Sequence, residues 1–211
     1  MPNKKSQGSS SWIPTSDYIN AFDFDYMETY SFNRLSSQLA AEYDELSVKR
    51  EQGPLPIAER TRWEELETRY NGFDLLVNSN GTFHPSAEKR ATFPANDPLA
   101  IHFKQILQME VFVWAPTLCA PYYRDAVIFC DASNKIVSVL NICLSCLYMT
   151  DGNQFLKADF EVYDLARKFF LENGHPIEEP HRFMMKQFGD MKAKKMAERG
   201  AKDIINPSPP Q

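Results

Sequence analysis

Hydrophobic residues recur at helical spacing in two consecutive segments of the first half of the chain. The first stripe predicts a helix over about 31–50 and consists of Leu35, Leu39, Tyr43 and Leu46. Gly53 and Pro54 end that helix. Pro56 suits the first turn of the next helix, whose stripe consists of Trp63, Leu66, Tyr70, Phe73 and Val77. Together the two stripes predict an antiparallel helical hairpin.

The middle of the chain has the shorter, β-branched segments that are typical of strands. Turn residues predict a loop over 78–98, and Asp97 followed by Pro98 predicts a helix over about 98–108. A β-rich stretch follows over 109–114. Asp125–Cys130 and Ile136–Cys146 are predicted strands joined by a hairpin loop. The second strand is nearly continuous in Val, Leu and Ile, which favours a central position in a sheet.

The helical period returns towards the end of the chain. The turn at 151–153 is expected to cap a helix whose stripe consists of Phe155, Ala158, Val162, Leu165 and Phe169. A last helix over about 180–199 carries methionines on a basic background. The elements predict an α+β fold: a small antiparallel sheet with a central hairpin, flanked by the N-terminal helical hairpin and two C-terminal helices.

The same pattern predicts how the chain is organised. We expect a disordered tail over 1–14, a helical hairpin segment over 15–80, an α+β core with a cysteine-bearing hairpin over 81–205, and a second disordered tail over 206–211.

Composition narrows the functional class. The formal charge of -5 and pI near 5.4 argue against a general nucleic-acid binder. No stretch approaches the roughly 20 apolar residues of a membrane span, and the polar start lacks the apolar region of a secretory signal. The sequence therefore predicts a cytoplasmic protein. In that reducing compartment its four cysteines should be thiols or metal ligands rather than disulfides.

Charge is unevenly distributed along the chain. Seven acids and one base lie between Asp17 and Glu45, whereas seven bases and two acids lie between His181 and Lys202. Either the two ends pack together or are solvated faces, or the basic end docks on an acidic partner. The candidate partner-binding residues on the last helix are Met184, Met185, Phe188, Met191, Lys192 and Lys195. A core-facing stripe is the favoured alternative.

The cysteines carry the main candidate chemistry. The three thiols Cys119, Cys143 and Cys146, with His102, Cys130 or water as a fourth ligand, have the ligand count of a tetrahedral zinc site. Such a site needs a turn between Cys143 and Cys146 and a loop that brings Cys119 back over the strand. Buried, unligated thiols are the favoured interpretation, so no cofactor is expected, and zinc is the alternative. A thioredoxin-like role fits poorly, because Tyr148 to Gly152 separate the pair from the next helix.

One segment resembles a pattern in small uncharacterised bacterial proteins. There, a cysteine and Pro-Arg precede a strand ending Phe-Tyr-Asp, and the next strand ends Ile-Cys-Phe-x-Cys. Here the match runs from Cys119 through Phe129 and Asp131 to Cys146, and continues to about residue 176. Two tyrosines split the Pro-Arg pair, and Cys130 replaces an aromatic residue. The resemblance implies no established activity.

No glycine-rich phosphate loop, G-x-S-x-G or H-E-x-x-H motif occurs in the sequence. Asp23 and Asp25 lack the preceding hydrophobic strand of a magnesium-binding aspartate pair. We therefore expect a non-enzymatic interaction or accessory protein, of the immunity or adaptor kind, that binds a protein partner or itself. The alternative is a small metalloprotein or thiol-dependent enzyme that uses Cys119, Cys143 and Cys146.

Overall fold

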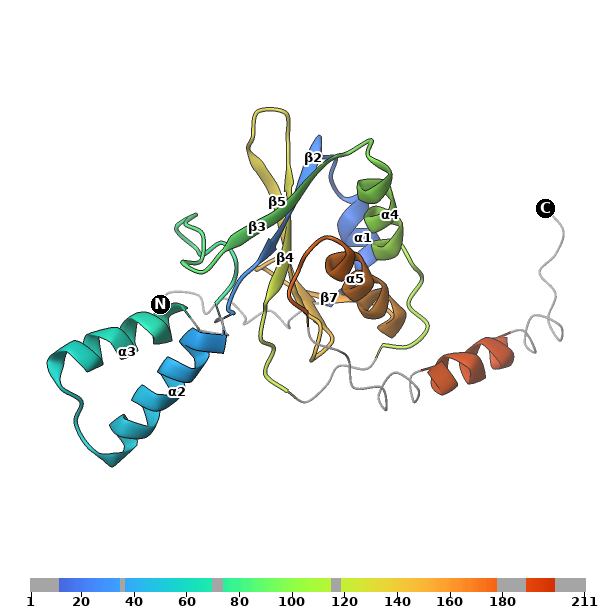
Figure 1. The fold of residues 1–211 in the computed structure, drawn as a ribbon. Coiled ribbons are helices and arrows are strands. Elements are labelled where there is room, and N and C mark those ends of the chain that lie inside the picture. The colour runs from blue at the N-terminus through green and yellow to red at the C-terminus, as the bar shows by residue number, and fades with distance from the viewer. Residues whose placement is uncertain (1–11, 35–36, 70–73, 115–118, 178–188, 200–211) are drawn as a thin grey trace, which may run out of the picture.

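A seven-stranded mixed sheet forms the centre of the protein in the computed structural model (Figure 1). The structure describes residues 12–34, 37–69, 74–114, 119–177 and 189–199. The strand order is β1-β7-β6-β5-β4-β2-β3. The strands are β1 (Ile13–Pro14), β2 (Tyr26–Ser31), β3 (Glu88–Pro94), β4 (Asp125–Cys130), β5 (Ile136–Cys143), β6 (Tyr148–Thr150) and β7 (Phe155–Lys157).

The α+β class holds, but the predicted small antiparallel sheet is wrong. The sheet is larger because β2 and β3 extend it beyond the central β4–β5 hairpin, and it is mixed because β1 pairs in parallel with β7. Residues 88–94, expected in a loop, form β3. Residues 155–157, expected in a helix, form β7. Both strands are short or exposed, so their sequences lack the apolar runs that indicate buried strands.

Within the described ranges, five helices and a further helical segment accompany the sheet. They are α1 (Thr15–Asn20), α2 (Ser37–Gln52), α3 (Ile57–Arg69), α4 (Pro98–Leu107), α5 (Phe160–Glu172) and the segment 189–199. The prediction of α4 is confirmed, since the Asp97 side chain accepts a hydrogen bond from the Leu99 amide at 2.8 Å. The α5 start differs, because Asp159 rather than the 151–153 turn caps it. None of the described helices has the length and apolar character needed to cross a bilayer.

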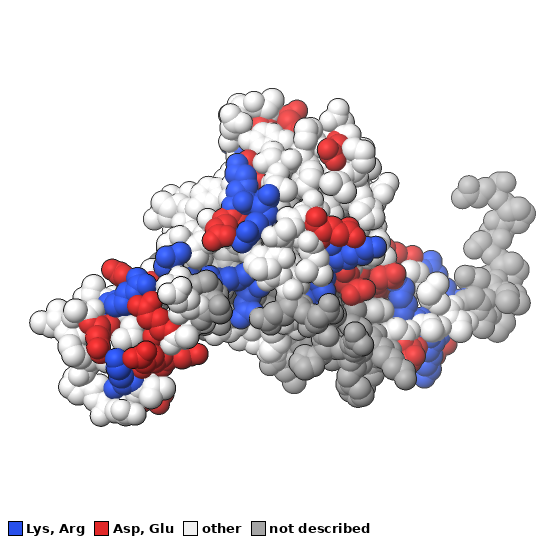
Figure 2. Space-filling model, in the orientation of Figure 1, with Lys and Arg blue, Asp and Glu red and all other residues white. Residues whose placement is uncertain are grey.

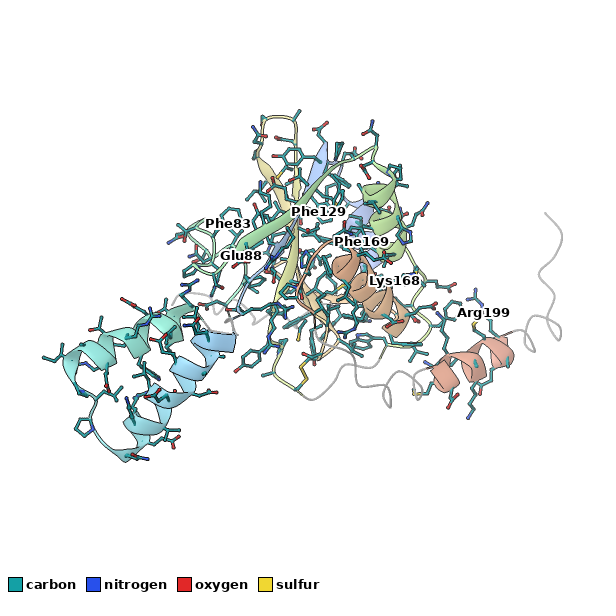
Figure 3. The ribbon with its side chains drawn as sticks, viewed as in Figure 1. Phe83, Glu88, Phe129, Lys168, Phe169 and Arg199 are labelled. Atoms are coloured by element: carbon teal, nitrogen blue, oxygen red, sulfur yellow. A yellow bond between two sulfur atoms is a disulfide. The ribbon has the colours of Figure 1, made fainter. Side chains whose placement is uncertain are left out.

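Two apolar clusters lie on opposite faces of the sheet. The larger one fills the layer between the sheet and helices α1, α4 and α5, and Figure 3 shows Phe129 of β4 and Phe169 of α5 within it. The smaller one lies on the other face and includes Tyr30, Phe32, Leu76, Tyr123, Ala126, Ile128 and the cysteines 130, 143 and 146. The alternation of side chains along β4 produces this division, because residues 127 and 129 face the helices while 126, 128 and 130 face away.

Helices α2 and α3 form the predicted hairpin. It follows β2 and precedes β3 in the chain, and it projects away from the sheet (Figure 1). We call residues 37–69 the arm. Its two fully or nearly buried apolar side chains, Leu46 and Leu66, belong to neither core cluster. The predicted second helix is too long, because α3 ends at Arg69 and Val77 instead forms an isolated bridge with Phe83.

Candidate functional site

The arm leaves and rejoins the sheet at one point, which we call the root. Asn33 lies two residues after the end of β2 and has a left-handed backbone conformation with φ of 52°. Its side-chain amide donates to the backbone carbonyls of Asp74 at 3.3 Å and Tyr123 at 3.0 Å. Its backbone amide donates to Ser86 Oγ at 2.8 Å. One buried asparagine therefore ties together the segments before and after the arm and the segment that leads into β4.

His84 completes the polar network at the root. Its Nδ1 accepts a hydrogen bond from the Ser86 backbone amide at 3.2 Å and lies 2.9 Å from Ser86 Oγ. Because a backbone amide can only donate, Nδ1 is unprotonated and the ring proton is on Nε2. Burial lowers the pKa of His84, which keeps the ring neutral. A cavity of about 480 Å³ adjoins the root and is lined by the 74–79 and 84–85 segments and the 151–153 turn.

The arm is held together by a thin apolar seam and a set of surface pairs. The rings of Tyr43 and Trp63 stack with centroids 6.2 Å apart, and the Arg50 guanidinium lies 3.9 Å from the Trp63 ring centre. Arg62 binds the Glu42 carboxylate through two nitrogens, at 2.8 and 3.0 Å, and lowers the pKa of Glu42. Surface pairs of this kind contribute little stability individually. The arm therefore maintains its shape without much support from the core.

Charged side chains cover the arm surface (Figure 2). The segment 37–69 has eight acidic and five basic residues, a net charge of -3. Several of the bases are occupied by ion pairs within the arm, such as Lys49 with Glu45 at 2.9 Å. In the part of the chain that the structure describes, the exposed carboxylates of Asp44 and Glu51 form no ion pair. Val48 and Ile57 are also exposed, by 53% and 76%. The arm thus presents an acidic surface with apolar side chains within it.

The cysteine arrangement differs from the prediction in one respect. Cys119 and Cys146 form a disulfide, whereas all four cysteines were expected to be thiols or metal ligands. A turn over 144–147 follows Cys143, and the disulfide brings Cys119 to this turn, with 6.1 Å between the Cα atoms of Cys119 and Cys146. Cys143 and Cys130 are buried free thiols. The disulfide was not predicted because the sequence led us to expect a reducing compartment, in which disulfides are rare.

His102 lies apart from the cysteines. It is exposed on α4, on the helical side of the sheet, while the thiols line the opposite face. Within the described ranges, no group of three or more His, Cys, Asp or Glu side chains is placed to hold a metal ion. Asp25, from the acidic pair, accepts a hydrogen bond from the Ala132 amide at 2.6 Å and so supports the β4–β5 hairpin loop.

The described part of the basic end, residues 189–199, contacts acids, and none of the ion pairs found there involves the acidic run near the start. Lys192 binds Asp159 at 3.3 Å and also binds Glu161, Lys195 donates to the Phe112 carbonyl at 3.1 Å, and Arg199 pairs with Glu110 at 2.7 Å. Figure 3 shows Arg199 on this helical segment. Met191 remains 45% exposed. The candidates Met184, Met185 and Phe188 lie outside the described residues.

A buried charged group escaped the sequence analysis. Asp125, at the start of β4, accepts a hydrogen bond from Arg34 at 2.7 Å and lies 2.8 Å from His175 Nδ1. Asp125 and His175 are 1% and 3% exposed. Their positions, 50 residues apart, give no local sequence signal, and the arrangement joins the end of β2 to the end of α5.

No protein-family model, characterised protein or solved structure matches the chain.

Proposed function

We propose that this protein is a non-enzymatic binding protein and that the arm docks on a basic surface of a partner protein. The observation that carries the proposal is the arm itself: a helical hairpin that stands away from the sheet and whose buried leucines belong to neither core cluster. An insertion that adds little to its own domain's core is more readily explained by contact with another molecule.

Charge supports a basic partner. The arm has a net charge of -3, and its exposed Asp44 and Glu51 are not neutralised by a described cation. A complementary positive surface would be attracted over a distance of roughly 8–10 Å at physiological salt. Exposed Val48 and Ile57 would supply apolar contact area once the partner has docked. A nucleic acid would be repelled by the same charge.

The last helix is a weaker candidate for the docking surface. Lys192, Lys195 and Arg199 already bind groups of the protein's own core. A partner would have to displace these contacts before it could use the basic side chains. Asp44 and Glu51 of the arm, which form no described ion pair, therefore support the proposal better than the basic helix does. We place the protein in the cytoplasm, as an adaptor or immunity-like component.

The test compares matched charge reversals in one chain. Asp44→Lys with Glu51→Lys reverses exposed acids on the arm, and Asp164→Lys with Glu172→Lys reverses two exposed acids on α5. Because Asn33 and Asp74 are already hydrogen-bonded at 3.3 Å, a short glycine-serine linker can also replace the arm without stretching the sheet.

A photo-crosslinker at Val48 then identifies what the arm touches in a native lysate. We expect a partner with a basic contact surface whose capture is lost in the arm reversal and in the deletion. Capture should be retained in the α5 reversal and should weaken as salt is raised. Capture that persists after arm deletion, or a monomer that retains nothing, would show that the arm is not a docking element.

A further inference from the structure

Three of the four cysteines lie at one end of the sheet. Cys143 is the last residue of β5 and pairs with Tyr148 of β6, so the intervening turn over 144–147 contains Cys146. Cys143 and Cys146 belong to the same apolar cluster. Cys119 is joined to Cys146 by the disulfide, drawn as a yellow bond in Figure 3. The free thiol of Cys143 is therefore three residues along a tight turn from a disulfide sulfur.

Exposure distinguishes the three residues. Cys119 is exposed, Cys146 is 8% exposed and Cys143 is 1% exposed. A thiol that is released at Cys119 would reach solvent, whereas a thiol at Cys143 would not. In a reducing cytoplasm disulfides are usually transient and serve redox chemistry rather than structure. A disulfide with one exposed cysteine, beside a buried third thiol, suits such a transient role.

We propose that the three cysteines form an internal thiol–disulfide exchange unit. The Cys143 thiolate attacks Cys146 Sγ, so that a Cys143–Cys146 bond forms, the Cys119–Cys146 bond breaks, and Cys119 leaves as a thiolate. The proton that Cys143 gives up is balanced by the proton that Cys119 can take from solvent. No external oxidant or reductant is consumed. The exchange moves the reactive sulfur from a buried position to an exposed one.

Two contacts define the turn between the cysteines. The Arg167 guanidinium on α5 donates to the Leu144 carbonyl at 3.0 Å. The Cys143 sulfur lies 3.5 Å from Ser145 Oγ, within the same turn. By contrast, Cys130 is the last residue of β4 and pairs with Ile136 at the start of β5, at the opposite end of that strand from Cys143.

The substrate class of this unit is a small disulfide. Once released, the Cys119 thiolate attacks one sulfur of an external disulfide, forms a mixed disulfide with it, and expels the other half as a thiolate. The Cys143–Cys146 bond is not consumed in that step. Cys119 is thus the modification site, and Cys143 is the residue that exposes it.

Tryptic peptides separate the two disulfide states. Cleavage after Lys104, Arg124, Lys135 and Lys157 places Cys119 in 105–124, Cys130 in 125–135, and Cys143 with Cys146 in 136–157. Protein purified without reductant is incubated with iodoacetamide, quenched at intervals, digested and analysed without reduction. We expect alkylated 105–124 to appear together with 136–157 that has lost two hydrogens. The linked pair of peptides should decline in parallel.

Matched variants establish the role of Cys143. In Cys143→Ser and Cys143→Ala, labelling of Cys119 should be at least tenfold slower, whereas Cys130→Ser should label like the wild type. In the wild type and the two Cys143 variants, labelling of buried Cys130 in 125–135 reports unfolding, so a destabilised variant is recognised. Glutathione disulfide should add its half-molecule to 105–124 in the wild type but not in Cys143→Ala.

Three results would overturn the proposal. The first is a purified protein without the 105–124 to 136–157 link. The second is a wild type whose Cys119 stays unlabelled for hours. The third is a Cys143→Ala variant that labels Cys119 at the wild-type rate while Cys130 stays protected. None of these depends on the arm or its partner, so this proposal and the docking proposal can fail separately.

Discussion

Truncation of Leu66 should destabilise the arm and leave the sheet unchanged. Leu66 on α3 is fully buried and Leu46 on α2 is 6% exposed, and the apolar seam between the two helices also includes the stacked rings of Tyr43 and Trp63. Replacement of a buried leucine by alanine costs about 2–5 kcal/mol. Since each 1.4 kcal/mol is a factor of ten in an equilibrium, even the lower figure raises the population of the opened arm more than tenfold.

The effect should be local because the arm contributes to neither core cluster. Hydrogen exchange followed by mass spectrometry separates local from global opening. In Leu66→Ala, amides of 37–69 should exchange at least tenfold faster, while those of β4 and β5 keep their wild-type rates. The matched control is Leu140→Ala, a fully buried leucine of β5 within the larger core cluster, which should accelerate exchange throughout the sheet.

The comparison can contradict the reasoning directly. If Leu66→Ala accelerates exchange in β4 and β5 as strongly as in the arm, the arm is part of the cooperative core. In that case the arm could no longer be explained as an element whose role is to bind a partner. If exchange changes nowhere, the seam is not what holds the two helices together.

Three further outcomes follow from single groups. Because the pKa of His84 is lowered in the folded protein, the unfolded chain binds more protons than the folded one below about pH 6.5. The free energy of unfolding should therefore fall as the pH drops through that range. His84→Asn should flatten this part of the pH profile measured by urea melts. Arg34→Met leaves the Asp125 carboxylate buried without its cation and should lower the free energy of unfolding, measured by chemical denaturation, by about 3–5 kcal/mol. The double variant Arg34→Met with Asp125→Asn should recover a large part of this loss. Lys192→Ala removes contacts between the segment 189–199 and the core, so that segment should exchange faster while the melting temperature changes by no more than a few degrees.

The sequence predicted those elements whose own residues determine them. The strongly apolar β4–β5 hairpin and the Asp97-capped α4 follow from local pattern and are confirmed. By contrast, β3 has exposed side chains along most of its length, and β7 has three residues. These segments are extended because they pair with a neighbouring strand. Their own sequence pattern does not indicate a strand, so local periodicity does not predict them.

The site residues show the same limit. Cys119 and Cys146 were named together only as two of three possible zinc ligands, on the condition that a loop folds back over the strand end, and buried, unligated thiols were the favoured interpretation. Their bond was not predicted, since the expected compartment excluded it. Asn33, His84 and Asp125 carried no signal at all. Each is defined by partners that lie 40 or more residues away or by a turn that the sequence marked only as a loop.

Asn33 also links the two proposals physically. Its amide nitrogen holds the Asp74 carbonyl at the root of the arm and the Tyr123 carbonyl four residues after Cys119. The disulfide restrains the same 119–123 segment from its other end. Release of Cys119 therefore removes a covalent restraint on a segment that positions the arm, while the Asn33 bond remains. The disulfide and the Asn33 bond act on one short segment. A change in the cysteines should therefore first alter the mobility of the arm root, and through it the docking surface.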